Sequence, residues 1–160
     1  MTMGKIVQPE ELKKIRAQLQ SERKKVVFTN GCFDILHRGH LEYLLKSKAL
    51  GDVLVVGINT DNSMRRIKGP RRPIIPQDDR AFIVAHLSPV DYVCLFDEDT
   101  PLALISSLLP DILVKGADWN LDGIVGKDIV EGAGGRVTTI DLVPNHSTSS
   151  IIEQIVGLFS

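Results

Sequence analysis

Short apolar runs that alternate with helix-like segments constrain the fold of this chain more than any other feature. Five such runs have the length of strands: 24–28, 52–58, 91–95, 111–115 and 136–142. The run 52–58 is apolar almost throughout, as is typical of a strand buried on both faces of a parallel sheet. Five strands separated by helices predict an α/β protein, with right-handed crossovers and helices on both faces of the sheet.

The first of the connecting segments, residues 9–22, is expected to form an N-terminal helix on the outside of the domain. Pro9 suits the first helical position, and Leu12, Ile15 and Leu19 recur at helical spacing. We expect further helices at 40–50, 78–87, 123–131 and 149–158, and one that begins after Thr100. The polar stretch 59–77 is expected to be a mobile loop.

Two helix starts carry capping signals. Thr100 is expected to be an N-cap with Pro101 in the first helical position, and Ser150 with Glu153 has the spacing of a capping box. Acidic residues 97–99 could resemble a metal site, but acids are favoured before a helix N-terminus, and we prefer that simpler interpretation.

The length of 160 residues fits one domain, with residues 1–22 packed onto a domain of residues 23–160. The net charge of −1 argues against a surface that attracts nucleic acid or membranes. Residues 1–14 contain no apolar signal-peptide core, and no apolar run approaches the ~20 residues that span a bilayer. Cys32 and Cys94 are too few for a disulfide framework, so we expect reduced thiols and a cytoplasmic protein.

The first candidate site segment follows the first expected strand and opens the next helix. Its candidate ligand contacts are Thr29, Asn30, Gly31, Phe33, Asp34, His37, Gly39 and His40. Ligands of doubly wound sheets bind beyond the carboxyl ends of strands, where free N–H groups of a helix start favour anions. His37 and His40 should face the same side of the first helical turn and donate hydrogen bonds to phosphoryl oxygens as negative charge develops.

Other interpretations of this segment are weaker. The loop has neither the Walker A pattern nor GxGxxG. The two histidines could be incidental or packed on the surface, and a zinc pair would need further ligands that the sequence does not place.

The second candidate segment is basic and follows the second expected strand. It contains Arg65, Arg66, Lys68, Arg71 and Arg72, with Arg80 shortly after. Such a run is often only a solvated face, but at this edge of the sheet it suits a triphosphate and a sugar phosphate. We expect Lys68, Arg65 and Arg72 to contact phosphates, and Arg80 could instead be structural.

Two more segments follow the fourth and fifth expected strands. In 114–119, Gly116 permits close approach of a ligand, Asp118 can accept hydrogen bonds, and Trp119 can stack on a base or sugar. The alternative is a simple turn with Trp119 packed in the core. In 146–150, the hydroxyls of Ser147 and Thr148 and free helix N–H groups offer a second phosphate site, although capping alone could explain them.

These segments together resemble the two signatures of the cytidylyltransferase-like nucleotidyltransferases. The first is Asn30–Asp34 with the HxGH sequence 37–40, and the second is Ser147–Ser149. From about residue 26 to 152 the chain is similar to the adenylyltransferase domain of bacterial ADP-heptose synthases. Segments 67–73, 97–101 and 113–118 add to that similarity. The resemblance implies a Rossmann-like sheet of order 3-2-1-4-5, in which the Asn30 and Gly116 loops flank one cleft.

The resemblance also implies a reaction. A nucleotidyl group, most simply adenylyl, would pass from a nucleoside triphosphate to D-glycero-D-manno-heptose 1-phosphate, giving activated heptose for lipopolysaccharide synthesis and pyrophosphate. Members with two domains also carry a sugar kinase, and this chain is similar to a stand-alone transferase. Its partners would be these small molecules and a second copy of the chain in a homodimer.

The resemblance assigns roles by position. His37, His40 and Lys68 would be catalytic. Nucleotide contacts would come from Thr29, Asn30, Gly31, Phe33, His37, Gly39, His40, Gly116, Asp118, Ser147 and Thr148. Contacts to the acceptor would come from Asn30, Asp34, Arg65, Arg72, Asp118 and Trp119. Mg²⁺ would accompany ATP, with no protein ligand assigned.

Three alternatives remain open at this stage: a glycerol 3-phosphate cytidylyltransferase, a coenzyme adenylyltransferase, and a nucleotide-binding regulator without turnover. The choice among ATP, GTP and CTP and the anomer of the sugar phosphate also remain open.

Overall fold

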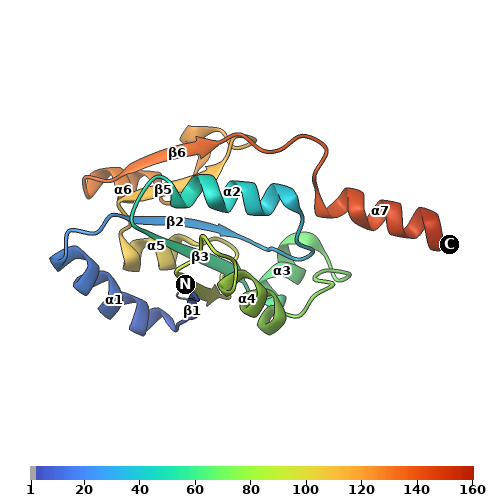
Figure 1. Ribbon diagram of the computed structural model, residues 1–160, viewed down its shortest axis with the longest axis horizontal. Coiled ribbons are helices and arrows are strands. Elements are labelled where there is room, and N and C mark those ends of the chain that lie inside the picture. The colour runs from blue at the N-terminus through green and yellow to red at the C-terminus, as the bar shows by residue number, and fades with distance from the viewer. Residues whose placement is uncertain (1–2) are drawn as a thin grey trace.

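A six-stranded parallel sheet forms the centre of the computed structural model, which describes residues 3–160 (Figure 1). Its strands are β1 (Lys5–Ile6), β2 (Val26–Gly31), β3 (Val53–Asn59), β4 (Tyr92–Phe96), β5 (Ile112–Gly116) and β6 (Arg136–Ile140). The order is β1-β4-β3-β2-β5-β6, and all five pairings are parallel. The five strands from β4 to β6 have the expected order 3-2-1-4-5, so the expected α/β fold is confirmed.

The expected count of five strands was wrong, because β1 adds a sixth strand at the edge of the sheet. Its two residues pair with β4 at Tyr92 and Val93, and both are exposed. The pairing therefore depends on backbone hydrogen bonds, and a two-residue exposed strand has no apolar alternation from which a sequence pattern could be detected.

Helices lie on both faces of this sheet (Figure 1). The seven α-helices of the described residues are α1 (Pro9–Ser21), α2 (Arg38–Lys48), α3 (Asp61–Lys68), α4 (Gln77–Ala85), α5 (Leu102–Leu108), α6 (Lys127–Gly132) and α7 (Thr148–Phe159). One core unites α2 and α4 with one face, and another unites α1, α5 and α6 with the opposite face. The sheet is therefore doubly wound.

Successive side chains along a strand point to opposite faces of the sheet and so pack into the two cores in turn. Leu54, Val56 and Ile58 of β3 belong to the core under α2 and α4, whereas Val55 belongs to the opposite core. All four are fully buried. Burying a side chain of this size contributes roughly 1.5–3 kcal/mol, so the near-continuous apolar run fixes this strand at the centre of the sheet.

The stretch 59–77 was wrongly expected to be a loop throughout, because its first half is helix α3. Thr60 caps this helix by accepting a hydrogen bond from the Ser63 N–H at 3.2 Å, and Gly69 ends it with φ 96°. That positive φ suits glycine, so both boundary signals were present in the sequence. The polar composition of the stretch concealed them.

Two expected caps are also corrected. Pro101, not Thr100, occupies the N-cap of α5, and no side chain caps that helix. For α7 the N-cap is Ser147, which accepts from the Ser150 N–H at 3.0 Å, in place of the predicted capping box of Ser150 and Glu153. A run of adjacent hydroxyl residues offers several equivalent caps, and the sequence does not choose among them.

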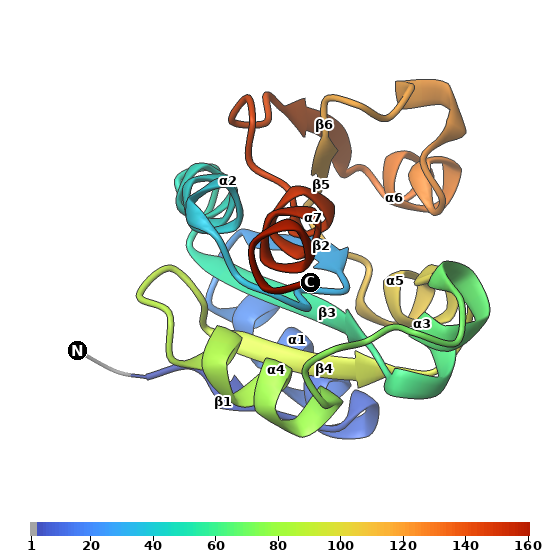
Figure 2. The ribbon, with the colours of Figure 1, turned by 90° about the vertical axis from the view of Figure 1, so that its right-hand side faces the viewer.

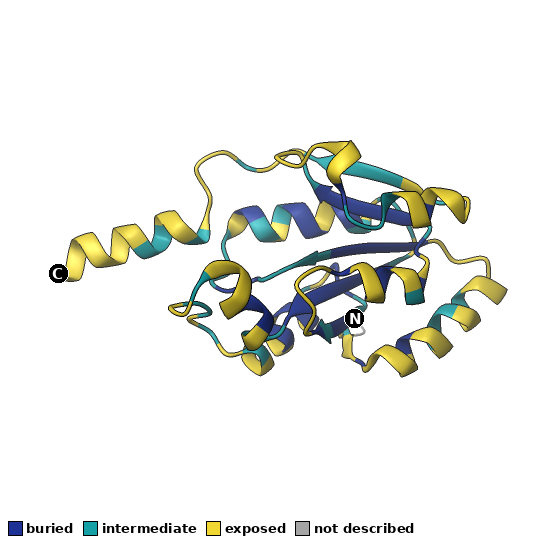
Figure 3. Cartoon of the chain, turned by 180° about the vertical axis from the view of Figure 1, so that it is seen from behind, coloured by how far each residue is buried: buried dark blue, intermediate teal, exposed yellow. Residues whose placement is uncertain are grey.

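Helix α7 projects from the body of the molecule (Figure 1) and points toward the viewer in Figure 2. None of its residues is buried, and Figure 3 shows it exposed along most of its length. Its large exposed apolar side chains are Ile155, Val156, Leu158 and Phe159. Among residues 3–160, no helix is both long enough and apolar enough to cross a bilayer.

Candidate active site

The candidate site is a cleft at the carboxyl ends of β2 and β5, where two cavities of about 390 and 630 Å³ meet. We call the smaller one the histidine arm, because of these two cavities it is the one that reaches His37, Gly39 and His146. The larger is the basic arm, which alone reaches Asp34, Asn59 and Arg72. We call the residues that line both arms the seam. They are Asn30, Gly31, Cys32, Phe33, His40, Lys68, Lys115, Asp118, Trp119 and Thr148.

The two HxGH imidazoles lie against each other at the start of α2. His37 is the N-cap of the helix, and the ring centroids of His37 and His40 are 3.8 Å apart. The backbone N–H of His37 donates a long hydrogen bond of 3.4 Å to Nδ1 of His40. Since Nδ1 accepts, the proton of a neutral His40 lies on Nε2, which leaves that N–H to donate to a ligand.

Burial keeps these imidazoles neutral. Burial and the charge of His37 together lower the pKa of His40 to about 4. Burial, and then His146, also lower the pKa of His37, whose Nδ1 is buried without a hydrogen-bond partner. A buried nitrogen with no partner in the described chain is a group that a ligand would satisfy.

The low pKa of His40 predicts acid sensitivity. In the unfolded chain His40 regains a pKa near ~6.5, so protonation favours the unfolded state. This contribution to the free energy of unfolding should be complete above pH ~6.5 and should decline as the pH falls toward 4. Urea unfolding at pH 7 and pH 5 should show a smaller pH difference for His40→Asn than for wild type. The control is His86→Asn, at an exposed histidine, and equal differences in all three proteins would contradict the assignment.

Glycines let the chain pass close to these groups at two points. A Cβ on Gly39 would lie 3.0 Å from Nδ1 of His37 and 3.1 Å from Cβ of His146. A Cβ on Gly116 would lie 2.6 Å from a carboxylate oxygen of Asp118. Both glycines therefore permit close packing around the histidine arm, and the close approach of a ligand to Gly116 stays a prediction.

The start of α7 is tied to the same loop. Thr148 Oγ1 donates to the carbonyl of Ile35 at 3.1 Å, across 113 residues of sequence. Ser147 and His146 line the histidine arm beside it. The first turn of α7 thus faces the first turn of α2, and two helix N-termini, each favouring anions, border one cavity.

The predicted basic residues separate into different roles. Lys68 lies on the seam, and Arg72 lies in the basic arm. Arg65 bonds to Asn62 on the exposed face of α3 and is absent from the lining of either arm. Arg66 pairs at the surface with Asp97 and Asp99. Arg80 is buried and structural, the alternative that the sequence left open.

Asp34 organises the loop of the basic arm. Its fully buried carboxylate accepts from Arg72 Nε at 2.6 Å and from the N–H groups of Ile74 and Ile75. Burial would raise the pKa of Asp34, but the backbone donors of Ile75 and Ile74 and then Arg72 lower it. The carboxylate thus joins the loop after β2 to the loop after α3, and keeps Arg72 in the basic arm.

Lys115 is a seam residue to which the sequence analysis gave no role. It is the penultimate residue of the strand sequence ILVKG, and its amine donates to Asn30 Oδ1 at 2.6 Å. It also lies 5.2 Å from the ring centroid of Trp119, whose side chain is half-exposed in the cleft and is not in the core. The sequence did contain a signal for this role, because a lysine near the end of an otherwise apolar strand is rarely buried without a partner.

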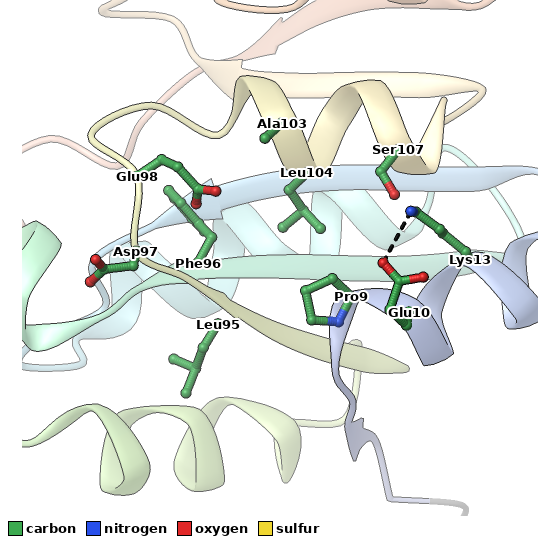
Figure 4. A pocket seen from close by; sticks show the side chains of 10 residues that line it. All are labelled: Pro9, Glu10, Lys13, Leu95, Phe96, Asp97, Glu98, Ala103, Leu104 and Ser107. Atoms are coloured by element: carbon green, nitrogen blue, oxygen red, sulfur yellow. Dashed lines mark hydrogen bonds and ion pairs between the residues drawn. The ribbon is translucent and has the colours of Figure 1, made fainter.

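Another pocket lies between α1 and α5, and its lining contains no histidine, cysteine or arginine (Figure 4). Its cationic and anionic side chains include the exposed pair Lys13 and Glu10, 3.1 Å apart, over an apolar floor that contains Leu104. None of the predicted site residues lines it. Among residues 3–160, no group of three or more His, Cys, Asp or Glu is placed to hold a metal ion, and Cys32 and Cys94 are free thiols.

Comparisons with known proteins agree with this geometry. The family model described as cytidylyltransferase-like matches residues 28–154. The chain is 57% identical over 143 residues to the bifunctional protein HldE of Citrifermentans bemidjiense, covering 89% of this chain and 29% of that protein. It is 53% identical over 144 residues to the HldE of Helicobacter pylori, covering 90% and 30%. The chain thus spans under a third of these relatives.

A solved structure extends the comparison to the fold. A lipopolysaccharide core biosynthesis protein from Thermoplasma volcanium superposes with a TM-score of 0.62 at 32% identity, covering 75% of this chain and 97% of that one. The matched family segment begins in β2 and ends in α7, so it contains both signatures that border the cleft. The chain belongs to the cytidylyltransferase-like family of nucleotidyltransferases.

Proposed function

We propose that this chain transfers an adenylyl group from ATP to D-glycero-D-manno-heptose 1-phosphate, releasing pyrophosphate and forming an activated heptose for lipopolysaccharide synthesis. The observation that carries the proposal is the meeting of the histidine arm and the basic arm at one seam. Two anionic substrates can occupy separate arms and still bring their reacting phosphates together there. The resemblance to the adenylyltransferase domain of ADP-heptose synthases supplies the identity of the substrates.

In this mechanism the triphosphate occupies the histidine arm. The Nε2–H of His40 and the imidazole of His37 donate to the α-phosphate, while the first turn of α7 faces the remaining phosphates. Gly116 leaves room for the nucleoside beside Leu142 and Val143, which line the same arm. Neutral histidines serve here as hydrogen-bond donors, and their low pKa values are consistent with that role.

The acceptor occupies the basic arm, where Lys68 and Arg72 face its anionic groups and Trp119 can stack on the sugar. Its phosphate oxygen attacks the α-phosphorus in line, the bond to the β-phosphate oxygen breaks, and pyrophosphate leaves. No covalent intermediate with the protein is required. Catalysis then consists of positioning and charge stabilisation, as in phosphoryl transfer generally.

Mg²⁺ fits this arrangement as an ion that arrives with the nucleotide. It is commonly held by substrate phosphates with one or two carboxylates, and Asp118 is a carboxylate on the seam. Asp34 is less suited to this task, because its oxygens already accept from Arg72 and two backbone N–H groups. When bound, the ion would neutralise phosphate charge.

The first experiment is pyrophosphate release with Mg²⁺, heptose 1-phosphate of either anomer, and ATP, GTP or CTP in turn. We expect turnover with ATP. Turnover with CTP and glycerol 3-phosphate would instead favour the glycerol 3-phosphate cytidylyltransferase. Nucleotide binding without pyrophosphate release, across these and other phosphorylated acceptors, would favour the regulator.

We also propose that the chain works as a cytoplasmic homodimer on small molecules, without nucleic acid or membrane partners. What supports the dimer is the apolar surface of α7, whose Ile155 and Phe159 are 48% and 83% exposed. Wild type should sediment as a dimer at micromolar concentration. Ile155→Asp with Phe159→Asp should weaken association at least about tenfold, since each large apolar side chain contributes roughly 1.5–3 kcal/mol when buried. The matched control is Gln154→Asp on the same helix, and a monomeric wild type would contradict the proposal.

A further inference from the structure

Lys115 is a buried cation that forms no ion pair with any described residue. The residue is 8% exposed, and no carboxylate of residues 3–160 lies within ion-pair distance of its amine. Burying an unpaired charge is costly, so such a group is normally paired or shifted toward its neutral form. Burial lowers the pKa of Lys115 to about 8, although Asp118 and then Cys32 raise it.

Lys115 lines the cleft, with its amine 5.2 Å from the ring centroid of Trp119 and only one of its donors used by the described chain. An ammonium has three N–H donors, and in residues 3–160 its one hydrogen bond goes to Asn30 Oδ1. Asn30 belongs to β2 and Lys115 to β5, which are neighbouring strands. The pairing of these strands therefore holds the two side chains next to each other. Both residues line both arms.

We propose that Lys115 binds the phosphate group of the acceptor at the seam, with its amine held in place by Asn30. This inference rests on the proposed function, because it assigns one residue of that site to one substrate. The attacking oxygen must come within about 3–3.5 Å of the α-phosphorus, so the acceptor phosphate has to lie where the arms meet.

The acceptor phosphate, and not the triphosphate, is the anion that Lys115 matches. The histidine arm already offers the triphosphate His37, His40 and the first turn of α7. In the basic arm Arg72 donates its Nε–H to Asp34 at 2.6 Å, so only the remaining N–H groups of its guanidinium can face the acceptor. Lys68 approaches the seam from α3 and Lys115 from β5, so two cations from different elements can hold the acceptor phosphate against the repulsion of the triphosphate.

Calorimetry can separate the two substrates. Protein saturated with Mg²⁺ and α,β-methylene-ATP, which cannot transfer its adenylyl group, is titrated with heptose 1-phosphate. Lys115→Met should raise the acceptor Kd at least about tenfold, as expected for a lost hydrogen bond to a charged group, and Lys115→Arg should raise it less. Affinity for the ATP analogue should stay within about twofold of wild type. Lys127→Met is the matched control, since Lys127 pairs with Asp122 away from the cleft.

Retained affinity for the ATP analogue also shows that the variant is folded. If Lys115→Met does not fold, Lys115→Gln keeps a polar side chain at the site and is expected to show the same selective loss. An unchanged acceptor Kd, or an equal loss of affinity for acceptor and ATP analogue, would overturn the proposal.

Inorganic phosphate serves as a second probe, which tests the role of Lys115 even if heptose 1-phosphate is not the acceptor. If wild type does not bind heptose 1-phosphate, the proposed acceptor is wrong, and inorganic phosphate is titrated into the same nucleotide-saturated protein. A rise of about tenfold or more in its Kd in Lys115→Met would support a phosphate site at Lys115. Equal phosphate binding by wild type and variant, or no phosphate binding, would overturn it.

Discussion

Replacement of His40 by alanine should lower kcat for nucleotidyl transfer at least ~10²-fold, on the scale of losing one donor to a developing oxyanion. The backbone N–H of His37 holds Nδ1 of this ring, so Nε2–H is the donor that remains for the phosphate. Because that hydrogen bond strengthens as charge develops, the KM values should change much less than kcat. Steady-state pyrophosphate release with each substrate varied in turn measures both parameters.

The control for this variant is His86→Ala, which also removes an imidazole. The His86 side chain is exposed and hydrogen-bonds to the Phe82 carbonyl of its own helix. Its kcat should equal that of wild type. Circular dichroism and affinity for the ATP analogue should confirm that His40→Ala is folded, since His40 also packs 5.3 Å from the ring of Phe33. A His40→Ala enzyme with near-normal kcat would remove His40 from the mechanism.

The sequence predicted those elements of the fold in which the pattern of apolar side chains matches the secondary structure of the backbone. The run 52–58 became β3 because its apolar side chains fill both cores. The edge strand β1 was missed because its pairing with Tyr92 and Val93 uses backbone groups alone. Helix α3 was missed because only Met64 and Ile67 of its eight residues are apolar, too few for an apolar stripe, although Thr60 and Gly69 mark its ends.

The candidate site divides in the same way. The segments after β2 and β5 were expected, from the family resemblance, to flank one cleft, and the structure places Asn30, His40 and Asp118 of these segments on the seam. The environment of a charged side chain was not predictable. Whether Arg65 faces solvent, or Lys115 bonds to Asn30, depends on which helix face or strand position carries it after folding.

Arg80 is the clearest example of a charged side chain whose environment the sequence did not predict. Among the basic residues, its replacement should lower the free energy of unfolding most. The side chain is 1% exposed and donates to the carbonyls of Cys32 and Ile75 and to Asp61, at 2.6, 2.9 and 2.8 Å. Arg80→Met should lower the free energy of unfolding by about 3–5 kcal/mol, because it leaves Asp61 and both carbonyls without their donors.

Thermal and urea unfolding of Arg80→Met can be compared with Arg66→Met, a change of the same chemistry at the surface. Arg66 is 45% exposed in its ion pairs with Asp97 and Asp99, and exposed pairs of this kind contribute little to stability because solvent screens them. Arg80→Met should therefore melt roughly 10 °C below wild type, while Arg66→Met melts within about 3 °C of it. Equal losses in the two variants would mean that the three bonds of Arg80 do not stabilise the loop after β2. A large loss for Arg80 alone would show that the basic stretch contains a structural anchor, whose contacts with Cys32 and Ile75 hold the two loops that form the basic arm.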